Sequence, residues 1–69
     1  MEYNYSKLKG KIKEVCGTQG VFAVGMRLSE NSISQKLNNE SEWSQIEMEA
    51  AMKILGLNKG DIVEYFFSI

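Results

Sequence analysis

Apolar side chains recur three and four positions apart along most of the sequence, which is the spacing of amphipathic helices. Two neighbouring segments in the first half carry such stripes: Phe22, Ala23 and Met26, then Ile33 and Leu37. Ser29 lies between them, where its hydroxyl can accept a backbone N–H as the N-cap of the second segment. The pattern over residues 19–38 therefore predicts two short helices joined by a tight turn.

A helix before this pair is predicted from a stripe with spacing i, i+4, i+7: Leu8, Ile12 and Val15. Asn4 or Ser6 can cap its start. Gly17 suits its C-terminal cap, and Thr18 suits the N-cap of the helix that follows. The chain is thus expected to stop one helix and begin the next within a few residues.

A fourth helix has the clearest start signal in the chain. Ser44 and Glu47 have the spacing of a capping box, and Trp43 can pack on Met48 as a hydrophobic staple. Its apolar stripe is Met48, Ala51, Met52 and Leu55. Gly56 is expected to end it. Trp43 can alternatively contact a partner, although the staple is the simpler interpretation.

Residues 58–61 are predicted to start a short fifth helix, which carries more apolar residues than one stripe requires. Ile62 and Phe66 define one stripe and Val63 and Phe67 a neighbouring one. The second stripe is either buried as well or exposed, and an exposed apolar patch suits pairing with a second copy. The candidate dimer contacts are Val63, Phe67 and Ile69.

These elements predict one all-α domain, residues 1–69, built as a five-helix bundle. Hydrophobic residues make up 43% of the chain, enough for a compact core. No apolar run reaches the 18 residues of a membrane span, and no leader with a cleavage site is present. We therefore expect a cytoplasmic protein without membrane contact.

Catalytic and metal chemistry have little support in the sequence. The chain has no His and one cysteine, Cys16, which we interpret as a small buried apolar residue. No Gly-rich phosphate loop or paired-carboxylate pattern is present, and 69 residues leave little room to enclose a substrate. We expect no enzyme activity, no metal and no cofactor.

Charge is divided unevenly along the chain, although the net charge is -1. Residues 1–39 hold six basic side chains and three acidic ones, whereas residues 40–69 hold two basic and six acidic. The basic half contains the predicted helix pair. A local positive footprint for nucleic acid is therefore compatible with an acidic protein.

The outer face of the helix over residues 29–38 is polar and mostly uncharged. Asn31, Gln35 and Asn38 lie opposite the apolar stripe, flanked by Ser32 and Ser34. Amide side chains can make paired hydrogen bonds to an adenine edge, and hydroxyls can donate or accept. This chemistry suits reading a major groove, whereas a solvated face more often carries Lys and Glu.

The helix pair resembles the Cro/repressor type of helix-turn-helix of phage and bacterial regulators. The matching positions are Gln19, Ala23, Leu28-Ser29, Ile33 and the Lys36-Leu37-Asn38 ending. The flanking residues 3–13 and 61–67 also look like small phage Cro-like proteins, so the resemblance covers nearly the whole chain. It implies a lambda-repressor-like DNA-binding bundle and a Cro-like repressor of phage or prophage genes.

Arg27 departs from the family pattern, because it stands where the turn usually has Gly. Gly25 lies two residues earlier. A left-handed Arg27 costs about 1 kcal/mol, so we expect either an altered turn or an early end of the preceding helix.

The first functional hypothesis is a sequence-specific regulator bound to double-stranded operator DNA, acting as a homodimer on a palindrome. The candidate base-reading residues are Asn31, Ser34 and Gln35, with Ser32, Glu30 and Asn38 at the margin. The candidate phosphate contacts are Gln19, Arg27, Lys36 and Lys9. Gln19 would use the first turn of its helix, where backbone N–H groups favour an anion.

The second hypothesis is a protein-binding modulator or antirepressor that complexes a phage repressor. The acidic C-terminal half, the C-terminal aromatics and the non-standard turn favour this alternative. Under it the helix-turn-helix is a scaffold, or its outer face contacts protein.

Overall fold

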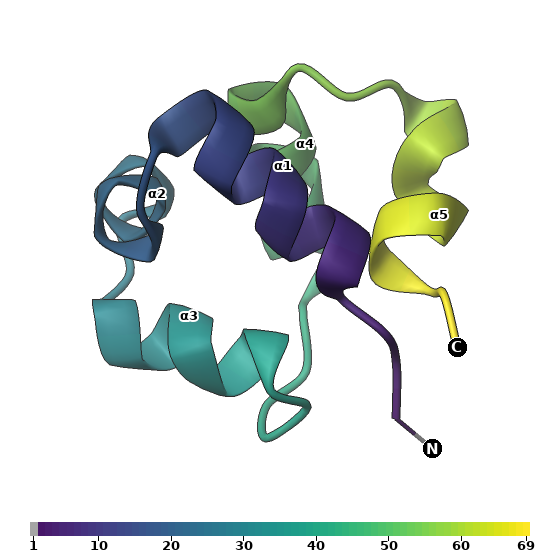
Figure 1. Ribbon diagram of the computed structural model, residues 1–69, viewed down its shortest axis with the longest axis horizontal. Coiled ribbons are helices and arrows are strands. Elements are labelled where there is room, and N and C mark those ends of the chain that lie inside the picture. Colours follow the sequence, from purple (N-terminus) through teal and green to yellow (C-terminus); the bar gives the residue numbers. More distant parts are fainter. Residues whose placement is uncertain (1) are drawn as a thin grey trace.

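The computed structural model describes residues 2–69, which form five α-helices and one 3-10 turn (Figure 1). The helices are α1 (Ser6–Cys16), α2 (Gln19–Met26), α3 (Glu30–Leu37), α4 (Gln45–Leu55) and α5 (Ile62–Phe66), with the turn at Lys59–Asp61. The predicted all-α, five-helix bundle is confirmed. No helix within residues 2–69 is long and apolar enough to cross a membrane.

Three helices begin at the side-chain caps that the sequence predicts. Thr18 and Ser29 accept the N–H groups of Val21 and Ser32 through their hydroxyls, at 3.1 and 3.0 Å. Ser44 forms the full capping box with Glu47 at the start of α4. Each cap satisfies backbone N–H groups that a helix end leaves without an internal partner, which fixes where these helices begin.

The first helix begins differently from either predicted cap. Its N-cap is Tyr5, whose side chain makes no capping bond, and Ser6 is already helical. The side chain of Asn4 still accepts the N–H of Ser6, at 2.9 Å. Asn4 therefore supplies the acceptor from one position earlier than a standard cap.

The turn between α2 and α3 keeps its geometry with Arg27 in the left-handed conformation, at φ 60°. The N–H of Leu28 donates to the carbonyl of Ala23, and the N–H of Arg27 donates to that of Val24. These bonds close the end of α2 in the way that a glycine usually permits. The chain therefore retains the turn and accepts the strain of a left-handed arginine.

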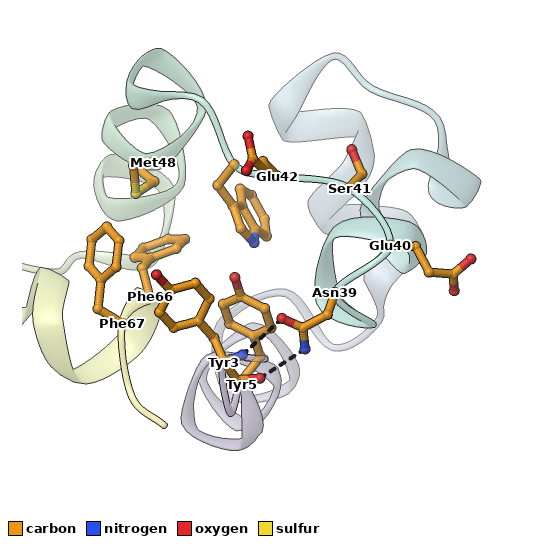
Figure 2. Close-up of a pocket in the computed structure, with 10 residues that line it drawn as sticks. Tyr3, Tyr5, Asn39, Glu40, Ser41, Glu42, Met48, Phe66 and Phe67 are labelled. Atoms are coloured by element: carbon orange, nitrogen blue, oxygen red, sulfur yellow. Dashed lines mark hydrogen bonds between the residues drawn. The ribbon is translucent and has the colours of Figure 1, made fainter. Parts of the chain in front are cut away.

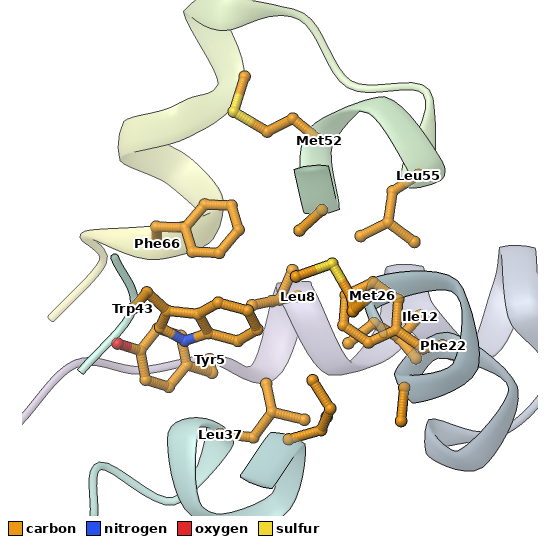
Figure 3. Close-up of a cluster of buried hydrophobic side chains, with 13 residues drawn as sticks. Tyr5, Leu8, Ile12, Phe22, Met26, Leu37, Trp43, Met52, Leu55 and Phe66 are labelled. Carbon is orange, nitrogen blue, oxygen red and sulfur yellow. The ribbon is translucent and has the colours of Figure 1, made fainter. Parts of the chain in front are cut away.

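The core lies between the four longer helices and is closed at one end by α5 (Figure 3). Its buried apolar residues are Tyr5, Leu8, Ile12, Phe22, Ala23, Met26, Ile33, Leu37, Trp43, Ala51, Met52, Leu55 and Phe66. Val15 was expected in the core stripe of α1, but it lies in the last turn of that helix and is 46% exposed. Cys16 is half-buried rather than buried.

The segment before α1 and the segment after α5 lie on the same side of the molecule (Figure 1). The N–H of Asn4 donates to the carbonyl of Ser68 at 2.7 Å, and Lys7 pairs with Glu64 at 2.8 Å between α1 and α5. A helix as short as α5 is not stable alone, so its order depends on burial of Phe66 in the core.

Candidate functional site

The outer face of α3, predicted to read bases, is accessible in the structure. Asn31 and Gln35 are exposed, as are Glu30 at its start and Asn38 after its end. Ser32 and Ser34 are half-buried and locally bonded. The Ser29 hydroxyl donates to that of Ser32 at 2.9 Å, and the Asn38 amide donates to the hydroxyl of Ser34 at 3.4 Å. The amide groups of Asn31 and Gln35 thus point outward, and the exposed charged side chain beside them is the acidic Glu30.

The four predicted phosphate contacts do not form one surface. Gln19 is half-buried and lines a shallow cavity of about 240 Å³ with the exposed Lys9, while Arg27 is exposed in the turn. Lys36 was predicted to contact a DNA phosphate, but in the structure it is buried and has no free surface to offer one. Its side chain turns inward against the α3–α4 loop and is 10% exposed.

Lys36 joins α3 to the start of α4. Its Nζ lies 3.0 Å from a carboxylate oxygen of Glu47 and donates to the carbonyl of Glu42 at 2.9 Å. It also lies 6.0 Å from the centre of the Trp43 ring, within cation–π range. Burial favours a higher pKa for Glu47, but hydrogen bonds from Ser44 and Lys36 outweigh it and hold the pKa below its ordinary value. The ammonium group of Lys36 is therefore occupied by contacts within the fold, and α3 has no exposed basic side chain.

A concave pocket of about 340 Å³ lies between the N-terminal arm (residues 2–5), the α3–α4 loop and α5 (Figure 2). Its lining is dominated by aromatic rings: Tyr3, Tyr5, Asn39, Glu40, Ser41, Glu42, Trp43, Met48, Phe66 and Phe67. Its volume falls in the range of small-ligand and side-chain pockets. The residues come from the two ends of the chain and its middle, so only the fold brings them together.

Aromatic pairs build the walls of this aromatic pocket. The rings of Tyr3 and Phe67 meet edge to face with centroids 5.6 Å apart, and those of Trp43 and Phe66 do so at 5.2 Å. Such pairs favour a defined ring geometry over loose hydrophobic contact. Figure 2 shows the phenol groups of Tyr3 and Tyr5 directed into the pocket. The pocket therefore presents flat apolar surface together with hydroxyl groups.

The N-terminal arm is fixed beside the pocket by Asn39. The Tyr3 N–H donates to the side-chain oxygen of Asn39 at 2.9 Å, and the Asn39 amide donates to the Tyr3 carbonyl at 2.9 Å (Figure 2). Asn39 is left-handed at φ 63°, a conformation that asparagine tolerates better than most residues. This paired amide contact determines where the two tyrosines lie.

The charge around the pocket is negative. Glu40 and Glu42 line it, and its lining includes no basic residue. Burial, and then the neighbouring Tyr3, raise the pKa of the Tyr5 hydroxyl above its ordinary value, so it remains a neutral donor at neutral pH. The pocket thus combines apolar walls, neutral hydroxyls and an acidic rim.

One polar atom in the pocket wall has no hydrogen-bond partner. Trp43 is 9% exposed, and its buried indole Nε1 donates to no acceptor among residues 2–69. A buried donor without an acceptor costs about 1–3 kcal/mol. Nearly all such groups in proteins are bonded, so this one marks an unusual position in the fold.

Some residues of this pocket stand out in the sequence, but their predicted roles were different. Trp43 was interpreted as a staple on Met48, and Phe67 as a dimer contact; both line the pocket. Val63 and Ile69, the other predicted dimer contacts, are 64% and 81% exposed. Tyr3, Tyr5 and Asn39 were not singled out. The sequence signal that could have indicated the pocket is the concentration of aromatic residues near both chain ends, which helical periodicity does not explain.

A comparison with protein families finds a match to the whole chain. The sequence model of the family described as protein of unknown function (DUF739) matches residues 1–69. The chain belongs to the DUF739 family. A comparison of this DUF739 protein with curated proteins found no match.

A solved structure resembles this DUF739 protein in both fold and sequence. It is the solution structure of the modulator of repression (MOR) of the temperate bacteriophage TP901-1 from Lactococcus lactis. The two chains are 51% identical, with 97% of this chain and 90% of the other covered and a TM-score of 0.84. The similarity thus extends over nearly the full length of both proteins.

These comparisons overturn the first functional hypothesis. The resemblance to Cro/repressor-type regulators was wrong as an assignment, because the family is DUF739 and the similar structure is a modulator of repression. The interpretation as a Cro-like repressor bound to operator DNA is wrong with it, and homodimerisation through Val63, Phe67 and Ile69 has no support. A physical reason is visible in α3: DNA binding depends on basic side chains, and Lys36 is withdrawn into an ion pair.

Proposed function

We propose that this protein modulates phage repression by binding a repressor protein. The observation that carries the proposal is 51% identity, over 97% of this chain, to the modulator of repression of phage TP901-1. Fold similarity alone would support no function, because one fold serves many. Identity of 51% over 97% of the chain is more than the few buried residues can account for, so it includes residues outside the core, where partners are recognised.

We assign the aromatic pocket as the docking site for the repressor. Aromatic side chains are enriched where proteins bind proteins, and binding energy concentrates in concave sites that exclude water. Phe67 is 42% exposed although it is a large apolar residue. A partner side chain that enters the pocket would bury this ring together with the edge of Tyr3, which packs on it.

The electrostatics favour a positively charged partner surface. Glu40 and Glu42 line the pocket, and its lining includes no base to repel such a surface. A DNA-binding repressor necessarily carries basic side chains. Charge complementarity of this kind increases the association rate and selects between partners.

Calorimetric titration of this protein with the purified TP901-1 repressor, and with the repressor of the phage that encodes this chain, tests the proposal. We expect a saturable complex with at least one of them. Phe67→Ala should weaken binding about tenfold or more, because it removes exposed ring surface from the pocket. Val63→Ala is the matched control: Val63 is 64% exposed but outside the pocket lining, so affinity should not change.

A mobility-shift experiment completes the test. Adding this protein to a repressor–operator complex should alter the shifted band, whereas this protein alone should produce no sequence-dependent shift. Absence of binding to both repressors would refute the proposed function. Binding that Phe67→Ala and Val63→Ala weaken equally would refute the docking site and leave the function standing.

A further inference from the structure

The unpaired N–H of Trp43 lies in a wall that the proposed function brings into contact with a partner. Figure 3 shows the indole nitrogen on the side of the ring toward Tyr5, and both residues line the aromatic pocket. A ring without a polar atom would fill the same space without the cost of an unsatisfied donor. The site becomes fully bonded only if something outside the free chain supplies an acceptor.

The chemistry of the pocket restricts what that acceptor can be. Lysine and arginine have no acceptor atom, so a cationic side chain cannot satisfy an indole N–H. A carboxylate would be brought beside Glu40 and Glu42 with no base in the lining to compensate its charge. Lys36, 6.0 Å from the centre of the Trp43 ring, is already paired with Glu47. Neutral acceptors remain, and among these a side-chain amide also brings N–H donors that the hydroxyls and carboxylates of the lining can accept.

We propose that Trp43 Nε1 donates a hydrogen bond to the side-chain amide oxygen of an asparagine or glutamine of the repressor. Trp43 is then a specificity-determining residue, because a partner without an acceptor leaves a buried donor unpaired. This inference rests on the proposed function and on the pocket as its site. It adds the chemical class of the group that enters the pocket.

The geometry also requires a small movement. Nε1 is shielded from solvent in the free protein, so an acceptor reaches it only when an adjacent wall of the pocket shifts outward. The N-terminal arm, which carries Tyr5, is such a wall, and hydrogen bonds of Asn39 and Ser68 hold it in place. An experiment can therefore distinguish two states of the indole N–H: shielded and unbonded in the free protein, and hydrogen-bonded in the complex.

Replacement of Trp43 by 3-benzothienylalanine tests the hydrogen bond without changing the size of the ring, because sulfur replaces the N–H. Trp43 is the only tryptophan in the chain, so incorporation at every tryptophan codon alters one internal position. We expect repressor affinity to fall about tenfold and the melting temperature not to fall, because the N–H makes no bond in the free protein. Unchanged affinity would overturn the proposal.

The same single tryptophan gives one indole signal in a proton–nitrogen NMR spectrum. On binding, we expect its proton to move downfield and to exchange more slowly with water. On the repressor side, each Asn and Gln is replaced in turn by Leu or Met. One replacement should weaken binding about tenfold, with no further loss against the benzothienyl protein.

These outcomes distinguish failure of the Trp43 hydrogen bond from failure of the proposed function. If neither repressor binds the wild-type protein, the proposed function fails. If the wild-type protein binds but the indole proton does not move, Trp43 is not a donor in the complex. If the indole proton moves and no amide of the repressor couples to Trp43, the amide assignment is overturned.

Discussion

Asn39 and Tyr3, 36 positions apart, are joined by two hydrogen bonds of 2.9 Å between the asparagine side chain and both backbone groups of the tyrosine. The side-chain amide can bond both backbone groups of Tyr3, as the backbone of a paired strand would, because it offers a donor and an acceptor side by side. This contact attaches the N-terminal arm to the end of α3. It thereby positions one wall of the aromatic pocket.

Asn39→Ala should lower the free energy of unfolding by about 2 kcal/mol, because it removes both bonds and places alanine at a left-handed position. Asn39→Gly is the matched variant. It also lacks the amide but tolerates the backbone, and should lose about 1 kcal/mol. Urea unfolding measures both, and amide exchange of Tyr3 should accelerate in each. Unchanged exchange of Tyr3 would show that the arm is held by other contacts.

Arg27→Gly should raise the free energy of unfolding by about 0.5–1 kcal/mol, because glycine adopts the left-handed turn without a steric cost. Arg27→Ala removes the same side chain and keeps the strain, so it should bring no gain. Thermal and urea unfolding of the two variants measure the difference. Equal stabilities would mean that the backbone strain at φ 60° has no energetic effect.

Ser44→Ala should lower the free energy of unfolding by about 1 kcal/mol, because the Glu47 N–H loses the hydroxyl that accepts it at 3.1 Å. The neighbouring exposed position provides the control: Gln45→Ala leaves the capping box intact and should be nearly neutral. Urea unfolding of the pair is sufficient. A loss of the same size in both variants would contradict a specific cap.

The depressed pKa of Glu47 predicts how stability depends on pH. A carboxyl whose pKa is lower in the folded state than in the unfolded state stabilises the fold above the unfolded value, and that stabilisation is lost as the pH falls through the folded value. Unfolding of the wild-type protein and Glu47→Gln should therefore differ most near neutral pH. The two should converge in the acid range below the ordinary value of 4.5. A difference that stays constant down to strong acid would show that ionisation of Glu47 is not the source.

The sequence was a good guide to local structure. The caps at Thr18, Ser29 and Ser44 form as predicted, because capping is an exchange between a side chain and backbone a few residues away. Arg27 adopts the left-handed conformation, but neither expected outcome occurs: the turn is kept, and α2 continues to Met26, directly before it.

The functional assignment failed for a different reason. Asn31 and Gln35 are exposed as the helical projection placed them, yet an amide face suits protein as well as DNA. Lys36 shows what the projection omitted: a long side chain can leave its own helix face and fold back onto a neighbouring acid. The comparison with the phage modulator, rather than the pattern, overturned the first hypothesis and supports the second.

What the sequence determined by itself is the set of helices, the starts of α2, α3 and α4, and most of the core, because each follows from interactions within one turn or one stripe. The tertiary structure alone decided the aromatic pocket. Tyr3, Trp43 and Phe67 come from the beginning, middle and end of the chain, and no local periodicity relates them. Their meeting depends on how the helices pack and on the Asn39 contact, which are long-range properties of the folded chain.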